Sequence, residues 1–307
     1  MIDKLLTDEI EKALIFPFGY GTNEGVIPES VAVLLSGGVD SLSVAFGADR
    51  LGKKITGYSF YLNQDKSYDY CKAEEVCKIM GWRFVGVPII TTLGRLEKDW
   101  MRLVKLGCVR KTHYECVYPF LHLYPAIEET FVLSGWGADG YYGMSRKANT
   151  DWKETREKQI EFMDTYFSPD KRAGYNWIKK VNDEYGKIFV TPYLNSAVKE
   201  WFYKREWDEL NRVDGKSKQK HHIRTSFTEF EKIGKVKNHI NLQKGGGIDL
   251  LFETLLRSKK ININKRRNTK DSKNGVMWMC KDWENVSTTY YDGNNGSSNT
   301  LMKFMEN

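Results

Sequence analysis

A short run of small and polar residues, SGGVDS at positions 36–41, directly follows the apolar run VAVLL. Gly37 and Gly38 allow the backbone to approach a phosphate closely, and the hydroxyls of Ser36 and Ser41 can donate hydrogen bonds to it. A helix that begins after such a turn adds free backbone N–H groups and the positive end of its dipole. The residue types and their order therefore favour a binding site for phosphate.

Asp40 does not fit a site that binds phosphate without a metal ion, because its carboxylate would repel the phosphate charge. It fits a magnesium ion that bridges phosphate oxygens, and such an ion takes one or two carboxylates together with phosphate and water. The run SGWGADG, with Asp139, supplies a second carboxylate after another apolar run, TFVL. Either turn alone is most often only a turn with a helix-capping side chain. Two matching turns favour a nucleotide site.

The segments around these turns alternate between strand and helix patterns, which predicts right-handed βαβ units and a parallel sheet. Because ligands of such sheets bind at the carboxyl ends of the strands, both turns are expected at one edge. The predicted order is strand 31–35, helix 41–51, strand 54–62, helix 67–81, strand 83–90, helical residues 93–127 and a strand that enters the turn at 134–140.

The second half of the chain has a different pattern. From about residue 151 the segments 151–167 and 195–213 are charged and aromatic and are predicted to form helices that pack on the sheet. After Arg257 the chain is basic and polar, and little regular structure is expected. We therefore predict a helical N-terminal segment (1–27), a main domain (28–256) and a basic, polar C-terminal tail (257–307).

Composition excludes several classes of protein. The 307 residues are 41% hydrophobic, enough for one large core or two modest ones, and the net charge of +7 suits phosphate-bearing ligands. The five cysteines form no CxxC pair, which favours a reduced protein over a disulfide or zinc framework. No apolar run approaches the roughly 20 residues that cross a bilayer, and residues 1–16 read as an amphipathic helix. A cytoplasmic protein without a membrane partner is expected.

Several motifs together resemble one family. SGGVDS matches the pyrophosphate loop of the PP-loop ATP pyrophosphatases, whereas the Walker A and dinucleotide GxGxxG patterns are absent. VLSGWGADGYYG resembles a turn of asparagine synthetase and β-lactam synthetase. TPYLN, KHHIR and LQKGGGI are similar to three further segments of that family and follow in the same order. The resemblance covers roughly residues 28–250 and implies an α/β fold, a Rossmann-like parallel sheet of the adenine nucleotide α-hydrolase type with a helical C-terminal extension.

The resemblance also implies ATP and Mg²⁺ as cofactors and a set of site residues. The set comprises Ser36, Gly37, Gly38, Asp40 and Ser41 for the pyrophosphate, Asp40 and Asp139 for magnesium, Leu34, Tyr58, Ser59 and Gly135 for adenine or ribose, and Lys220 and Lys244 for the charge of the departing pyrophosphate. The implied reaction is an AMP-forming ligation. A carboxylate attacks the α-phosphorus of ATP, and ammonia or an amine then displaces AMP from the acyl-adenylate.

The chain departs from the family pattern at two places. Asparagine synthetase has a glutaminase domain whose second residue is a nucleophilic cysteine, whereas residue 2 here is Ile2, so glutamine is not expected as a direct nitrogen donor. Trp136 stands where the family has a catalytic glutamate, and an indole cannot accept a proton. Trp136 is interpreted either as core packing or as the wall of a site for an apolar or planar acceptor.

Two alternatives to a small-molecule ligase remain open. A PP-loop enzyme that modifies a nucleobase would adenylate a carbonyl oxygen of the base, and the basic segment 257–273 would then bind nucleic acid. A catalytically silent nucleotide-binding protein would explain Trp136. The presence of both Asp40 and Asp139 favours an enzyme, because a silent scaffold needs no pair of metal-binding carboxylates. The sequence leaves the oligomeric state undetermined.

Overall fold

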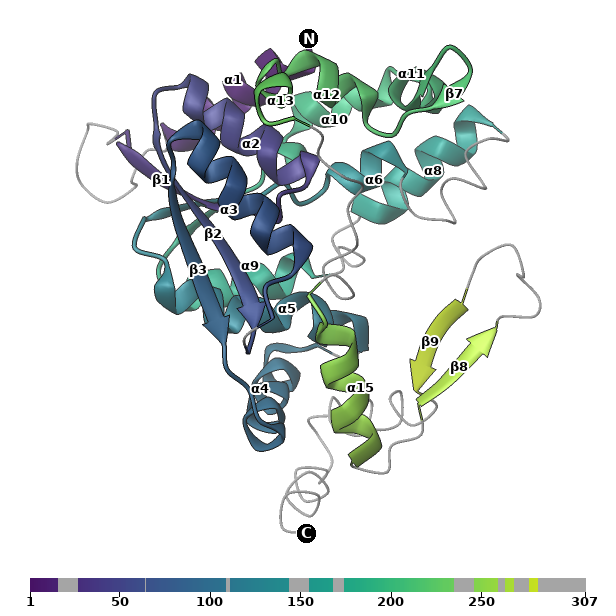
Figure 1. Ribbon diagram of the computed structural model, residues 1–307. Coiled ribbons are helices and arrows are strands. Elements are labelled where there is room, and N and C mark those ends of the chain that lie inside the picture. The colour runs from purple at the N-terminus through teal and green to yellow at the C-terminus, as the bar shows by residue number, and fades with distance from the viewer. Residues whose placement is uncertain are drawn as a thin grey trace, which may run out of the picture.

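Figure 1 shows the computed structural model of the protein. The structure describes residues 1–15, 27–63, 65–108, 111–143, 155–167, 174–234, 246–258, 263–267 and 276–280. The statements below concern these residues.

The centre of the molecule is a five-stranded sheet in which every neighbouring pair is parallel. The strand order is β3-β2-β1-β4-β5. This arrangement confirms the α/β class and the Rossmann-like sheet, while the last strand was not anticipated from the sequence. The strands are β1 (Ser30–Leu34), β2 (Lys54–Leu62), β3 (Arg83–Ile89), β4 (Phe131–Leu133) and β5 (Ile188–Val190).

Apolar side chains on the two faces of the sheet belong to two separate cores. Along β1, Val31 and Val33 join one core, whereas Ala32 and Leu34 join the other, as the alternation of a strand buried on both faces requires. The first core includes side chains from α1 (Ile2–Leu14), α2 (Val39–Arg50) and α3 (Tyr68–Met80). The second includes side chains from α4 (Leu93–Leu106), α5 (Lys111–Leu123), α9 (Tyr175–Glu184) and α15 (Ile248–Ser258).

The helical second half mostly extends the first core. Figure 1 shows α10, α12 and α13 gathered near α1 and α2, and apolar residues of all five helices pack in the same cluster. This confirms the expectation that the segment packs on the sheet. The elements are α6 (Ala138–Tyr142), α8 (Arg156–Phe167), the 3₁₀ turn Pro192–Leu194, α10 (Ser196–Tyr203), α11 (Trp207–Asn211), the short strands β6 (Arg212–Val213) and β7 (Lys216–Ser217), α12 (His221–Ser226) and α13 (Glu229–Lys232).

Local sequence signals explain where the helices beside the sheet begin and end. Ser67 caps α3 by accepting a hydrogen bond from the backbone N–H of Tyr70, and α3 ends before Gly81, as the sequence predicts. Thr92 caps α4 in the same way through the N–H of Arg95. Residues 93–127, predicted to be helical, form two helices, α4 and α5, followed by a 3₁₀ turn at Tyr124–Ala126.

One buried ion cluster joins three helices of the first core. The guanidinium of Arg50, in the last turn of α2, donates to both carboxylate oxygens of Glu229 in α13 at 2.7 and 2.8 Å, and to Asp3 in α1 at 2.9 Å. The two acids are buried, and Arg50 also lies over the ring of Phe227 at 4.7 Å. We call Arg50, Glu229 and Asp3 the Arg50 cluster.

The C-terminal region differs from its expectation. The basic, polar segment after residue 257 was expected to have little regular structure, but β8 (Ile263–Arg267) and β9 (Val276–Cys280) form an antiparallel pair. The reason is local, because Ile261 and Ile263 alternate with asparagines and VMWMC is rich in strand-forming residues. Within the described residues no helix is long and apolar enough to cross a membrane.

Candidate nucleotide and metal site

The two glycine turns meet at the carboxyl edge of the sheet because β1 and β4 are neighbours. The turn after β1 leads into α2, and the turn after β4 leads into α6. The two turns pack closely against each other, since a Cβ added at Gly135 would lie 2.4 Å from the carbonyl carbon and oxygen of Asp40. Only glycine therefore permits this packing of one turn on the other, which brings the carboxylates of both turns together.

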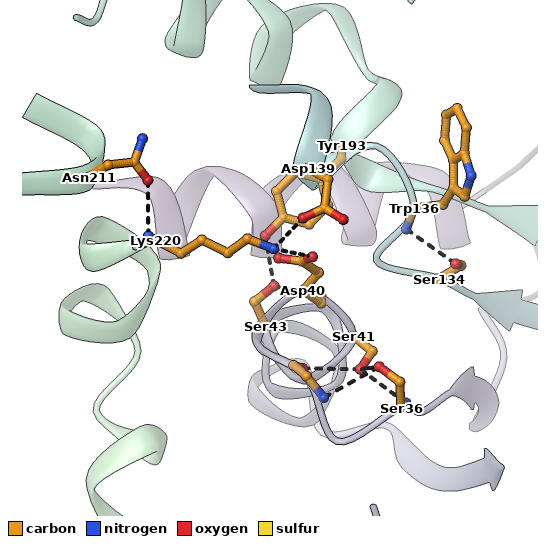
Figure 2. Close-up of polar contacts among 11 residues, drawn as sticks. Ser36, Asp40, Ser41, Ser43, Ser134, Trp136, Asp139, Tyr193, Asn211 and Lys220 are labelled. Carbon is orange, nitrogen blue, oxygen red and sulfur yellow. Dashed lines mark hydrogen bonds and ion pairs between the residues drawn. The ribbon is translucent and has the colours of Figure 1, made fainter. Parts of the chain in front are cut away.

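Two serines of the glycine turn after β1 stabilise that turn by hydrogen bonds, as Figure 2 shows. The hydroxyl of Ser41 donates to the carbonyl of Gly38 at 3.1 Å and accepts from the N–H of Ser36 at 3.3 Å. Gly38 is the N-cap of α2, and no side chain hydrogen bond caps this helix. The first turn of α2 therefore offers backbone N–H groups toward the carboxyl edge, which is the arrangement that binds anionic oxygens.

The two predicted metal-binding carboxylates lie on either side of one lysine ammonium. Lys220 Nζ lies 2.5 Å from Asp40 Oδ2 and 2.6 Å from Asp139 Oδ1 (Figure 2). Only 11% of the Lys220 side chain is exposed, against 22% for Asp40 and 52% for Asp139. The cluster is therefore enclosed on the lysine side and open to ligands on the Asp139 side.

Charge keeps this lysine protonated. Burial alone would lower the pKa of Lys220, but the negative charges of Asp40 and Asp139 outweigh burial and raise it above its usual value. Lys220 therefore remains a charged ammonium at neutral pH, between the side chains of Asp40 and Asp139.

The backbone of Lys220 has an unusual conformation, left-handed with φ 54° and ψ 37°. Its N–H donates to Oδ1 of Asn211 at 3.1 Å. Asn211 is itself fully buried, and its amide group donates to the carbonyls of Tyr142 and Trp207. A non-glycine residue in this conformation is costly and persists where the surroundings enforce it. Asn211 therefore sets the direction in which the Lys220 side chain leaves the backbone.

The chemistry of these side chains fits magnesium and a nucleotide polyphosphate. Asp40 and Asp139 place carboxylate oxygens within reach of a single cation, and oxygens are the ligands that Mg²⁺ takes in proteins. Among the described residues no group of three or more His, Cys, Asp or Glu side chains could hold a metal ion. Two carboxylates agree with a magnesium ion whose other ligands are phosphate and water, rather than with an all-protein metal cage.

Of the residues expected to contact adenine or ribose, Leu34 ends β1 and Gly135 lies in the second glycine turn, whereas Tyr58 and Ser59 lie in the middle of β2, which extends beyond β1. Leu34 and Ser59 are nearly buried. The hydroxyl of Tyr58 donates to Glu129 at 2.8 Å and accepts from the N–H of Glu128, both of which precede β4 and so lie toward the opposite edge of the sheet. The Tyr58 side chain is thus directed away from the glycine turns. A nucleotide contact by Leu34, Ser59 or the Tyr58 backbone stays a prediction.

Trp136 packs among aromatic rings rather than within the charged cluster. Its indole lies 5.2 Å from the Tyr175 ring and 6.0 Å from the Tyr166 ring, and Figure 2 shows it extending away from Lys220. The side chain is partly buried against the second core. Packing therefore accounts for the indole, and its role as the wall of an acceptor site stays a prediction.

Some predicted residues cannot be placed, and some neighbours of the site were missed. Lys244 and the rest of LQK lie outside the described residues.

Asn211 was missed because nothing in the sequence connects it to Lys220, nine residues later. Tyr193, within TPYLN, was also missed. Its hydroxyl lies 2.8 Å from that of Ser43, which donates to the carbonyl of Asp40. The motif could have indicated Tyr193 as a support for the first turn.

A second cation lies near the carboxylates. Arg224 follows Lys220 by one turn of α12 and is partly buried. Burial lowers the pKa of Arg224, and the charge of Asp40 opposes that decrease, which places the guanidinium in the field of the same carboxylate. Both outer basic residues of KHHIR therefore interact electrostatically with Asp40, Lys220 by an ion pair and Arg224 at longer range.

Comparison with known proteins identifies a family for this chain. The chain matches the family model described as asparagine synthase over residues 28–268. None of the curated proteins matches it. Among solved structures it is similar to the predicted subunit of a tRNA methyltransferase from Methanocaldococcus jannaschii, with 18% identity and a TM-score of 0.32, over 57% of this chain and 75% of that chain. Since the family match contains both glycine turns, the five-stranded sheet and Lys220, the chain belongs to the asparagine synthase family.

Proposed function

We propose that this protein is an ATP-dependent ligase that forms AMP and pyrophosphate by adenylating a carboxylate, which ammonia or an amine then attacks. The observation that carries the proposal is the meeting of Asp40 and Asp139 at one cation position, beside a turn whose backbone suits a phosphate. Family membership supports an ATP-dependent ligase. The carboxylate, the nitrogen donor and the AMP-forming course are our inference.

The side chains and backbone of the site have distinct roles in this reaction. The turn from Ser36 to Ser41 and the first N–H groups of α2 would hold the β- and γ-phosphates, which leave together as pyrophosphate. Asp40 and Asp139 would hold magnesium, which screens the negative charge on the phosphate oxygens when bound. Lys220 would add a positive charge beside the bond that breaks. The residues therefore act mainly by positioning and by charge stabilisation.

The atoms of the two steps balance without a further reactant. In the first step a carboxylate oxygen bonds to the α-phosphorus of ATP, and the bond to the bridging oxygen between the α- and β-phosphorus breaks. In the second step the nitrogen of ammonia or an amine bonds to the acyl carbon, the bond from that carbon to the phosphate oxygen breaks so that AMP leaves, and the nitrogen loses a proton to solvent. Indole cannot take the proton that the nitrogen loses, so Trp136 is not assigned as the base.

Exchange of labelled pyrophosphate into ATP tests the proposal. We expect exchange that depends on one carboxylate when small carboxylic acids, nucleosides and nucleic acids are screened separately. Asp40→Asn and Asp139→Asn should each lower the rate at least a hundredfold, whereas Asp208→Asn, a surface acid of α11 paired with Arg212, should not change it. Formation of ADP and orthophosphate without AMP would overturn the mechanism. Exchange that depends only on nucleic acid would favour the nucleobase-modifying alternative.

A further inference from the structure

The position between Asp40 and Asp139 is already filled by a cation of the chain itself. Lys220 Nζ is within 2.6 Å of one oxygen from each carboxylate, so it bridges them as a metal ion would. A magnesium ion coordinates oxygen at about 2.1 Å, so it competes with the ammonium for these oxygens and the space beside them. The ammonium and a bridging metal ion therefore cannot both hold this oxygen pair in the arrangement observed.

The surroundings of Lys220 allow its ammonium to move while its backbone stays. Asn211 holds the backbone N–H, and the carbonyl of Lys220 accepts from the N–H of Arg224 at the start of α12. The side chain has four rotatable carbons beyond this anchor. Tyr142, whose ring centre lies 6.0 Å from Nζ, lies beneath it, whereas Asp139 is half exposed on the open side. The ammonium can therefore swing toward a ligand at the open side without unfolding α12.

A free metal ion and a metal–nucleotide complex differ in what they offer the displaced ammonium. A free divalent ion would separate Lys220 from both carboxylates and provide no anion in exchange, and Arg224 nearby adds to the repulsion. A complex of the metal with ATP brings phosphate oxygens beside the same turn, and these can receive the ammonium. The site therefore discriminates against the metal alone.

We propose that Lys220 is an internal counter-ion that occupies the divalent-cation position between Asp40 and Asp139 and transfers to the nucleotide phosphates when metal and nucleotide bind together. This inference rests on the ATP site of the proposed function. It adds a specificity role for one residue, because Lys220 makes the protein select the metal–nucleotide complex over the free metal ion. It also explains why a lysine with a buried stem is held so close to two carboxylates.

Binding of Mn²⁺, followed by electron paramagnetic resonance of the free ion, tests the proposal without turnover. In the absence of nucleotide, Lys220→Met should bind Mn²⁺ at least tenfold more tightly than the unmodified chain. With the α,β-methylene analogue of ATP, which the proposed reaction cannot cleave, the same variant should bind the Mn²⁺ complex at least tenfold more weakly. Lys218→Met, an equal charge change at an exposed position of the same segment, should leave both affinities unchanged.

The opposite signs of the two effects distinguish the proposal from a structural role. If Lys220 only maintained the fold, its removal would weaken binding with and without nucleotide, and that result would overturn the proposal. Lys220→Gln provides a second neutral variant. Thermal unfolding in the absence and presence of Mn²⁺ checks that the variants fold. Lys220→Arg, which keeps the positive charge, should behave like the unmodified chain. Mn²⁺ binding without nucleotide needs no catalysis, so a failure of the proposed ligase reaction would leave this result unaffected.

Discussion

The buried amide of Asn211 satisfies three backbone groups at once. It accepts from Lys220 and donates to Tyr142 and Trp207, and none of its surface is exposed. Because Tyr142 belongs to α6, which follows the second glycine turn, one side chain relates the position of Lys220 to the helix that carries Asp139. The geometry of the charged cluster thus depends on a residue that touches none of the charges.

Replacing this amide should therefore affect both stability and ligand binding. Asn211→Ala leaves buried backbone groups without their partner, which should lower the free energy of unfolding by about 2 kcal/mol. It also frees the Lys220 backbone, so the affinity for the metal complex of the ATP analogue should decrease severalfold. Denaturant titration and calorimetric binding measure the two effects.

Asn182→Ala is the matched control for this prediction, since Asn182 is a fully buried amide that donates to the carbonyl of Lys187 away from the glycine turns. It should lose stability and keep nucleotide affinity. Equal losses of affinity in both variants would contradict the role given to Asn211.

Among the helices, α12 is the element whose placement matters most, because Lys220 is its N-cap and the helix contains only six residues. Ile223 of α12 and Phe230 of α13, the next helix along the chain, pack in the first core, where α12 also lies against α1 and α2. The Arg50 cluster joins α13 to the last turn of α2, and α2 begins at the first glycine turn. The first turn of α2 therefore carries Asp40, and its last turn is joined by ion pairs to α13, the helix that follows α12.

Arg50→Met tests this connection. The substitution leaves Asp3 and Glu229 buried without their cation, which should lower the free energy of unfolding by about 3 kcal/mol. Affinity for the metal complex of the ATP analogue should fall with it, because α12 loses its support. Arg212→Met removes an exposed i,i+4 partner of Asp208 and should change stability by less than about 1 kcal/mol. Unchanged stability of Arg50→Met would show that the cluster does not hold these helices.

Strand β2 carries a tyrosine that should make the fold sensitive to alkaline pH. Burial raises the pKa of Tyr58 to about 12, and its hydroxyl donates to Glu129. The neutral form is favoured in the folded state, so this contribution to stability is complete below the unfolded value near 10 and is lost as the pH rises through about 12. The free energy of unfolding should therefore decrease over this range, and less steeply in Tyr58→Phe. Parallel slopes in denaturant titrations of the two proteins would contradict this.

Over the whole molecule, the sequence predicted the parts whose signals are local. The alternation from β1 to β3, the two glycine turns and the stop of α3 at Gly81 all follow from short-range patterns. Strand β5 was missed because its three residues pair only with β4, more than fifty positions earlier. The β8 and β9 pair was missed because basic composition was given more weight than the alternation around Ile263.

The site was predictable to a similar extent. Asp40 and Asp139 could be paired because both follow strands of one parallel sheet. The sequence predicted Lys220 beside a phosphate and not between the two carboxylates. Its position depends on how α12 packs, and no periodicity in the sequence indicates that packing. The support from Asn211 depends on a left-handed backbone at a lysine, a conformation that residue type argues against.

The basic C-terminal strand offers a test of the acceptor class. Truncation at residue 256 would cut α15, whose Phe252 and Leu255 are fully buried, so substitution in the full chain is the sounder experiment. Replacing Lys265, Arg266 and Arg267 by glutamine should leave carboxylate-dependent pyrophosphate exchange within about twofold. A loss of nucleic-acid affinity, with a log–log salt slope smaller by about 2 to 3, would instead favour the nucleic-acid alternative.

Asp40 and Lys220 are 180 positions apart in the chain, although their side chains touch. During synthesis at about 5 to 20 residues per second, roughly 1.5 to 6 seconds pass between completion of the last sheet strand at Val190 and addition of Lys220. The same interval separates the emergence of β5 from the emergence of Lys220, so a nascent chain can contain the five-stranded sheet and both carboxylates before their lysine reaches them. If Lys220 excludes free metal ions as proposed, a chain in this interval lacks that protection.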